Sequence, residues 1–193
     1  MNGDVSQSGA GGASVGGIFG SAIGNLDGQS VTILDSKVTG NLFRIGNGHV
    51  GGFVGTIEGN GDKSLTIERA TVGTFELDTD GTTLIPVSRA NITGEGTGAQ
   101  SAAGLIGGIT GGTTQAGAAQ RIIVVEDINI YADIQRAQDT TAAASGLIGV
   151  VTGWCRGGVD ISTMSISNVT IAGSITGRET SGLISILSRT HID

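Results

Sequence analysis

The sequence predicts an all-β fold, a parallel β-solenoid of about four to five glycine-rich coils with loop insertions. The first observation behind this prediction is a Gly-apolar-apolar-Gly segment that recurs along the chain. Its five copies lie at 17–20, 52–55, 104–107, 146–149 and 182–185, and the last ends in serine instead of glycine. The leading glycines are 35, 52, 42 and 36 residues apart. Self-similarity on this scale indicates units that stack, because one unit cannot bury its own apolar face.

The second observation is a segment that alternates apolar and polar residues and lies between copies of the first. Its four copies span 33–42, 67–75, 125–134 and 166–175. A period of two is typical of a half-buried strand, and the Val, Ile and Thr that dominate here favour a pleated surface. Two polar residues in succession interrupt the alternation in each copy, which predicts a bend or bulge at that point.

Stacking these strands in register predicts three inward columns of apolar side chains, with neighbours about 4.8 Å apart. The columns are Ile33, Ile67, Val125 and Ile166; Val38, Val72, Ile130 and Ile171; and Phe19, Val54, Ile106, Ile148 and Ile184. The glycines of the first segment suit corners, where positive φ or close backbone approach is needed. The unequal spacing then places insertions at 78–100, which contains Pro86, and at 111–120.

Composition supports one ordered domain. Glycine accounts for 36 of 193 residues without a Gly-X-Y period, so the chain is not collagen, and the apolar columns argue against disorder. We expect a single solenoid domain over 14–193, preceded by a flexible or swapping segment at 1–13. The formal charge of −7 disfavours a nucleic-acid partner, and no apolar run approaches the ~20 residues of a membrane span. The single Cys155 is expected to be a small buried side chain.

The combination of Gly-Leu-Ile-Gly with a segment such as Ile-Ser-Asn-Val-Thr-Ile-Ala-Gly-Ser-Ile at 166–175 resembles the GLUG-motif repeats. Those repeats occur in large microbial surface proteins, many of them regarded as adhesins. The resemblance covers residues 14–187, and the copies at 104–107 and 146–149 match best. It implies a β-solenoid with an extracellular structural or adhesive role, and it supplies no catalytic residues.

Candidate metal ligands are few. The only histidines, His49 and His191, lie in different repeats, so we expect two solvated side chains and no transition-metal site. Asp78 and Asp80 are weak calcium candidates, since Asp-Thr-Asp-Gly-Thr resembles the start of a calcium loop. The distal glutamate of an EF-hand is replaced by Arg89, so a plain turn is favoured. We expect no cofactor.

The alternative function is that of a carbohydrate-active parallel β-helix enzyme or a glycan-binding module. Four charged residues occupy equivalent positions of two neighbouring repeats, namely Glu68, Arg69, Glu126 and Asp127. Convergent carboxylates of this kind could hydrolyse or cleave a polysaccharide. The flanking repeats carry Asp35 and Asn168 at the second of these positions, which favours a solvated corner with an ion pair between coils. A binding module would use Trp154 as its contact.

We therefore expect a non-enzymatic structural or adhesive protein at the cell surface or outside the cell. Both solenoid ends would present apolar strands, which copies would bury by stacking head to tail into a filament or surface layer. The side chains expected at these ends are Ile18, Phe19, Leu183, Ile184, Ile186 and Leu187. Surface glycans are a second expected class of partner. Sequons that would permit glycosylation begin at Asn91 and Asn168.

Overall fold

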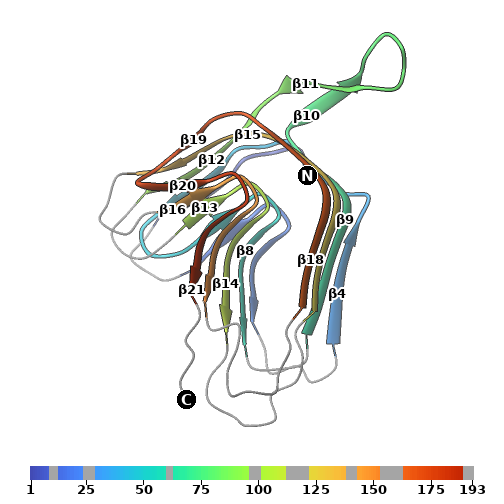
Figure 1. The fold of residues 1–193 in the computed structure, drawn as a ribbon. Helices are drawn as coiled ribbons and strands as arrows, with labels where there is room; N and C mark the ends of the chain where they lie inside the picture. The colour runs from blue at the N-terminus through green and yellow to red at the C-terminus, as the bar shows by residue number, and fades with distance from the viewer. Residues whose placement is uncertain are drawn as a thin grey trace.

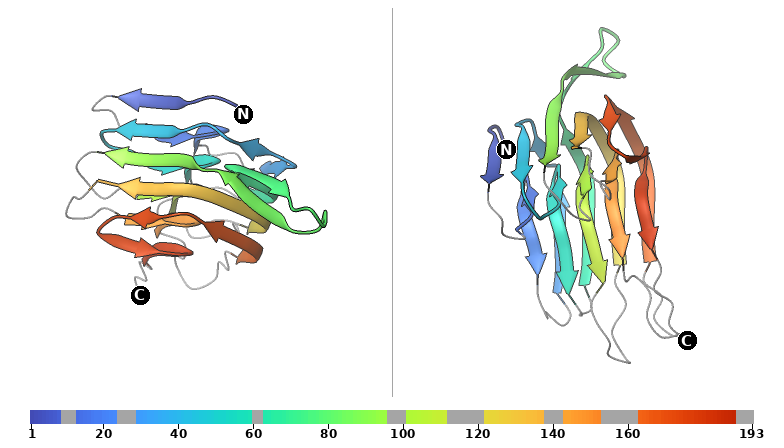
Figure 2. Two further views of the ribbon diagram at one scale, coloured as in Figure 1. Left: turned by 90° about the horizontal axis from the view of Figure 1, so that it is seen from above. Right: turned by 90° about the vertical axis from the view of Figure 1, so that its left-hand side faces the viewer.

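The chain is a stack of β-coils. A computed structural model describes residues 1–8, 13–23, 29–59, 63–95, 101–111, 122–137, 143–152 and 163–188. Within these ranges the chain forms strands and no helix. Strands of successive coils lie side by side (Figure 1), and the coils follow one another from the N-terminal to the C-terminal end (Figure 2). The predicted all-β parallel solenoid is confirmed.

The coils contribute strands to four parallel sheets. The first sheet holds β4 (Gln29–Leu34) with β5 (Lys37–Val38), β9 (Lys63–Val72), the beginning of β15 (Ile122–Arg136) and β18 (Thr163–Ala172). The second holds β1 (Val5–Ser8), β6 (Leu42–Ile45), β12 (Ala90–Glu95), the end of β15, and β19 (Ile175–Thr176). The third holds β2 (Val15–Gly16), β7 (Val50–Gly51), β13 (Ser101–Ala103), β16 (Ala143–Ser145) and β20 (Glu179–Ser181). The fourth holds β3 (Phe19–Ile23), β8 (Val54–Gly59), β14 (Ile106–Gly111), β17 (Ile148–Thr152) and β21 (Ile184–Ser188).

The strand register confirms the three predicted apolar columns. Two of them lie in the first sheet, through Ile33, Ile67, Val125 and Ile166 and through Val38, Val72, Ile130 and Ile171. The third lies in the fourth sheet, through Phe19, Val54, Ile106, Ile148 and Ile184. The members from the middle coils are fully buried, and each contributes about 1.5–3 kcal/mol through burial. These columns form the core.

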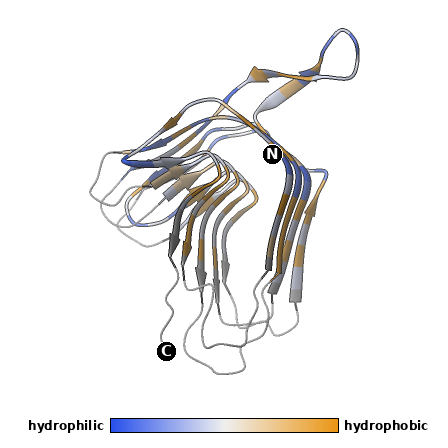
Figure 3. Ribbon diagram, viewed as in Figure 1, coloured by the Kyte–Doolittle hydropathy of each residue, from blue (hydrophilic) through white to orange (hydrophobic). Residues whose placement is uncertain are grey.

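Of the predicted bend or bulge, the structure shows a bend, at the same place in four coils: the strand register is the same on either side of it, so no strand carries an extra residue. The residue at the bend adopts left-handed backbone, with φ of 49° at Asp35, 51° at Arg69, 55° at Asp127 and 49° at Asn168. Aspartate and asparagine tolerate this region better than most residues do. The bend lies within the first sheet, which continues beyond it, and Figure 3 shows a band of hydrophilic residues where it crosses neighbouring strands.

The leading glycines of the repeated motif are required by close packing between coils. They have no positive φ. A Cβ on Gly17, Gly52, Gly104 or Gly146 would overlap the carbonyl oxygen of the leading glycine in the next coil. Gly182 is the exception, because nothing lies within 4 Å of its Cβ position. The column of glycines therefore ends in open space at the C-terminal coil.

The insertion expected at 78–100 is placed differently in the structure. A hairpin of β10 (Thr74–Leu77) and β11 (Leu84–Ser88) projects from the stack between β9 and β12 (Figure 1). Residues 90–95 are not part of the insertion, because they form β12 in the second sheet. The alignment of Phe75 with the ends of the other copies is consequently wrong. Ile92 takes that position, in register with Leu42 and Ile134.

The N-terminal segment belongs to the stack where it is described. Instead of being flexible or swapped at 1–13, Val5–Ser8 forms β1 and pairs in parallel with β6. The Met1 ammonium group donates a hydrogen bond to the carbonyl oxygen of Lys37 (2.5 Å). Residues 9–12 lie outside the described residues. Val38 of the first full coil is completely buried, because β1, Met1 and the corner between β2 and β3 cover it at the N-terminal end.

Candidate functional site

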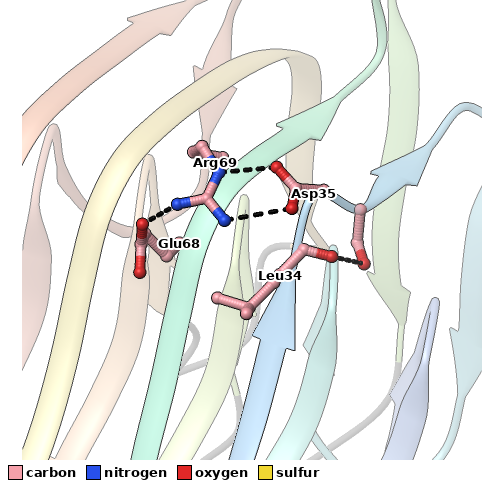
Figure 4. Close-up of polar contacts among 5 residues, drawn as sticks. Leu34, Asp35, Glu68 and Arg69 are labelled. Atoms are coloured by element: carbon pink, nitrogen blue, oxygen red, sulfur yellow. Dashed lines mark hydrogen bonds and ion pairs between the residues drawn. The ribbon is translucent and has the colours of Figure 1, made fainter.

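The charged residues singled out in the sequence form one exposed corner at the bend. Arg69 extends from β9 toward the preceding coil, and its Nε and Nη2 donate to the two carboxylate oxygens of Asp35 at 2.6 and 3.0 Å (Figure 4). Arg69 also contacts the Glu68 carboxylate. One coil further, the side-chain amide of Asn168 donates to Asp127 at 2.5 Å. The corner is thus a ladder of polar contacts between coils.

The electrostatics of this corner are those of a solvated ion pair. The hydrogen bond from Arg69 lowers the pKa of the Asp35 carboxyl, and the same bond raises the pKa of Arg69. Both side chains are largely exposed, so water screens the pair and its contribution to stability is small. The structure therefore brings Glu68 and Arg69 together, and it stacks Glu126 against Glu68 in the strand register. The ion pair expected between coils is present.

A second polar row, which sequence reasoning missed, runs along the start of the second sheet. Its members are Asp4, Asn41, Asn91, Asp133 and Ser174. A side-chain oxygen accepts the backbone N–H of the next member at three steps: Asp4 from Asn41 (2.7 Å), Asn41 from Asn91 (3.0 Å) and Asp133 from Ser174 (3.0 Å). The signal was present in the sequence, because each member immediately precedes an apolar residue of the second sheet.

The calcium candidates Asp78 and Asp80 lie in the turn of the projecting hairpin. Asp78 accepts the backbone N–H of Asp80 (2.5 Å), and Asp80 accepts that of Thr82 (2.8 Å). A hydrogen bond from the Thr82 hydroxyl group lowers the pKa of Asp80, with help from the backbone N–H groups of Thr82 and Thr83. Gly81, with φ of 71°, completes the turn. No group of three potential metal ligands occurs among the described residues.

His49 lies at the corner before β7 and is mostly buried, so the expectation of a solvated side chain is wrong for it. Its Nδ1 accepts a hydrogen bond from the backbone N–H of Ser101 (3.3 Å) and lies 2.8 Å from the Ser101 hydroxyl oxygen. Arg136 is fully buried nearby, and its Nη1 donates to the carbonyl oxygen of Gly94 (2.9 Å). Burial, with the charge of Arg136, lowers the pKa of His49 to about 4.

This environment predicts a loss of stability in acid. The pKa of His49 is about 4 in the folded protein and about 6.5 in the unfolded chain, so below pH 6.5 the unfolded state binds a proton that the folded state does not. The free energy of unfolding should fall by about 3 kcal/mol from pH 6.5 to 4 and then level off. Urea unfolding at several pH values across this range measures the decrease. In the His49→Gln variant the decrease should be smaller by this amount, and an unchanged pH dependence would contradict the low pKa of His49.

The residues expected at the solenoid ends lie there. Ile18 and Phe19 are 39% and 40% exposed at the N-terminal end, and Leu183 is 44% exposed at the C-terminal end. The equivalent residues of the three coils between them are at most 1% exposed, namely Phe53, Val54, Leu105, Ile106, Leu147 and Ile148. Ile184 is half-buried. The backbones of Ile186 and Leu187 belong to β21, and their side chains lie outside what the structure describes.

The two ends differ most clearly in the first sheet. At the N-terminal end Ile33 of β4 and Val38 of β5 are buried, although Val31 is 37% exposed, and in the second sheet Val5 of β1 is partly buried. At the C-terminal end the inward side chains are only partly buried, namely Met164, Ile166, Val169, Ile171 and Ile175. Their equivalents one coil earlier are at most 1% exposed, namely Ile123, Val125, Ile128, Ile130 and Ile134. The C-terminal end therefore opens the core to solvent.

Several residues that the sequence singled out lie outside the described residues: Trp154, Cys155, His191 and most of the 111–120 insertion. Both sequon asparagines lie on the surface. The side-chain amide of Asn91 donates a hydrogen bond to Asn41 (2.8 Å), and that of Asn168 donates one to Asp127.

Comparison with known protein families, curated proteins and solved structures found no match to this chain. Across the described ranges, no helix has the length and apolar character needed to cross a bilayer.

Proposed function

We propose that this chain is a non-enzymatic structural or adhesive protein of the cell surface or extracellular space. It associates end to end with copies of itself, as part of a filament or surface layer. The supporting sequence feature is the resemblance to surface repeats. The charged corner supports the non-enzymatic part, because Arg69 pairs with Asp35 of the preceding coil and with its neighbour Glu68 on an exposed edge. Polysaccharide depolymerisation by the purified protein that Glu126→Gln abolishes would overturn this part of the proposal.

The observation that carries the proposal is the open core at the C-terminal end. Inward side chains that are fully buried one coil earlier are partly exposed in the last coil, around Ile166, Ile171 and Ile184. Solenoid ends also leave strand edges without hydrogen-bond partners. A second subunit at this end would cover the apolar area and pair the edges, at roughly 25 cal/mol per Å² of apolar surface removed from water.

The test is a charge placed at this end. Ile184→Lys should weaken self-association at least tenfold, because the ammonium group would have to be desolvated in the contact. Sedimentation velocity over a concentration series, with negative-stain imaging, measures this. The matched control is Leu77→Lys, which puts the same charge on a residue 61% exposed in the projecting hairpin and should leave association unchanged. A wild-type protein that stays monomeric at all concentrations would contradict end-to-end assembly.

A further inference from the structure

The outermost strand of the first sheet at the C-terminal end, β18, has the character of an interface strand. It is ten residues long and carries no charged residue, and the uncharged stretch of the sequence runs from 161 to 177. Among the described residues, β18 pairs only with β15, so its other edge is free. Free edges in monomeric proteins are usually blunted by charges, proline or shortness. β18 has none of these protections.

The inner strands of the same sheet do carry charges. β9 includes Lys63, Glu68 and Arg69, and β15 includes Glu126 and Asp127. In β18 the corresponding outward positions hold serine, threonine and asparagine. The other long strand of the last coil, β21, is uncharged as well. On a chain with a formal charge of −7, two copies can meet at β18 without opposing charged side chains of this strand. The outermost strands of the N-terminal end, β1 to β4, are uncharged as well.

The N-terminal end of a second copy does not fit this edge completely. In the second, third and fourth sheets its outermost strands are β1, β2 and β3. In the first sheet the outermost strand is β4, which pairs with β9 and thus belongs to the following coil. A head-to-tail stack would set β1, β2 and β3 against β19, β20 and β21. It would leave a gap one strand wide between β4 and the first half of β18, which would remain unpaired. Beside β5 this position is taken by Met1, which is hydrogen-bonded to Lys37 and Thr39.

We propose that β18 pairs in antiparallel fashion with β18 of a second copy, about a two-fold axis normal to the first sheet. The first and fourth sheets face each other across the core (Figure 1), so the same axis brings β21 against β21. The apolar sides of both copies, including Ile166 and Ile171, then meet in one continuous core. The outward serines and threonines of the paired strands lie opposite each other without like-charge repulsion. This contact joins two C-terminal ends and is closed, so a filament or layer would also need a contact between the remaining ends. It specifies the partner in the end-to-end association proposed above, and it rests on that proposal.

Charge complementation tests this pairing. If the same strand of two copies meets in the contact, a positively charged variant and a negatively charged variant of that strand should associate with each other although neither associates with itself. Ser165 and Ser167 are exposed on the outward side of β18. The double variants S165K/S167K and S165E/S167E should each be folded monomers, since self-pairing would oppose like charges within a Debye length. Mixed in equal amounts, they should form a heterodimer that native mass spectrometry resolves by mass. The wild type should be a dimer in the same measurement.

The matched control is Thr32→Lys on β4, an exposed position in the outermost first-sheet strand of the other end. It should leave the dimer intact. The pairing is overturned if the mixture of the two double variants stays monomeric, or if either variant alone associates like the wild type. If Thr32→Lys abolishes association while the β18 variants do not, the end-to-end association stands and the β18 contact is wrong. A monomeric wild type would overturn both.

Discussion

Replacing Ile130 by aspartate should unfold the middle coils. Ile130 is completely buried in the third full coil, in register between Val72 and Ile171. A carboxylate at this position has no cation beside it in the column. Burying an unpaired charge is among the few changes that cost more than about 4 kcal/mol, out of a typical total of 5–15 kcal/mol. The variant should show no cooperative unfolding transition in urea when unfolding is monitored by far-UV circular dichroism.

The control for this variant is Asn129→Asp, which introduces the same charge one residue away. Because successive side chains of a strand point to opposite faces, residue 129 lies on the outward side of β15. We expect its free energy of unfolding to change by less than about 1 kcal/mol. Equal loss in both variants would indicate a general effect of negative charge in β15, and a stable Ile130→Asp protein would place this side chain outside the core.

The columns and the bend could be predicted from sequence because each is a local pattern that recurs. Alternation with period two identified the inward side chains, and two successive polar residues marked Asp35 and Arg69 as the place where the strand turns. Stacking then follows from repetition alone. The same logic located Ile18 and Leu183 at the two ends, since they occupy the first and last copies of the motif.

The prediction failed where a coil is interrupted. In the second full coil, the hairpin of β10 and β11 separates β9 from β12. Phe75 follows β9 closely in the sequence and fits the apolar pattern, although it belongs to the hairpin. β12 itself contributes Ala90, Ile92 and Gly94, a weaker apolar signal. The burial of His49 and of Val38 depends on contacts with residues far away in the sequence, so a local pattern does not predict it.

The second large effect is expected for Gly104→Ala. A Cβ at this position would overlap the carbonyl oxygen of Gly146 and come within 2.9 Å of Ile130 Cγ2. The neighbouring atom is backbone held in the strand ladder, so it cannot move aside as a flexible side chain could. The coils would have to separate locally, and overpacking of this kind costs about 1–3 kcal/mol or more. Urea unfolding should show a lower midpoint with an unchanged slope.

Gly182→Ala is the matched control, since it makes the same change at the equivalent position of the last coil. Nothing lies within 4 Å of the added Cβ, and Gly182 has no positive φ, so an alanine fits the backbone. Removing a glycine at such a site restricts the unfolded chain and should stabilise the subunit by about 0.4–1 kcal/mol. Equal destabilisation by both substitutions would mean that these glycines are needed for local conformation. A loss confined to Gly104→Ala would show that the motif is glycine because the next coil packs directly against it.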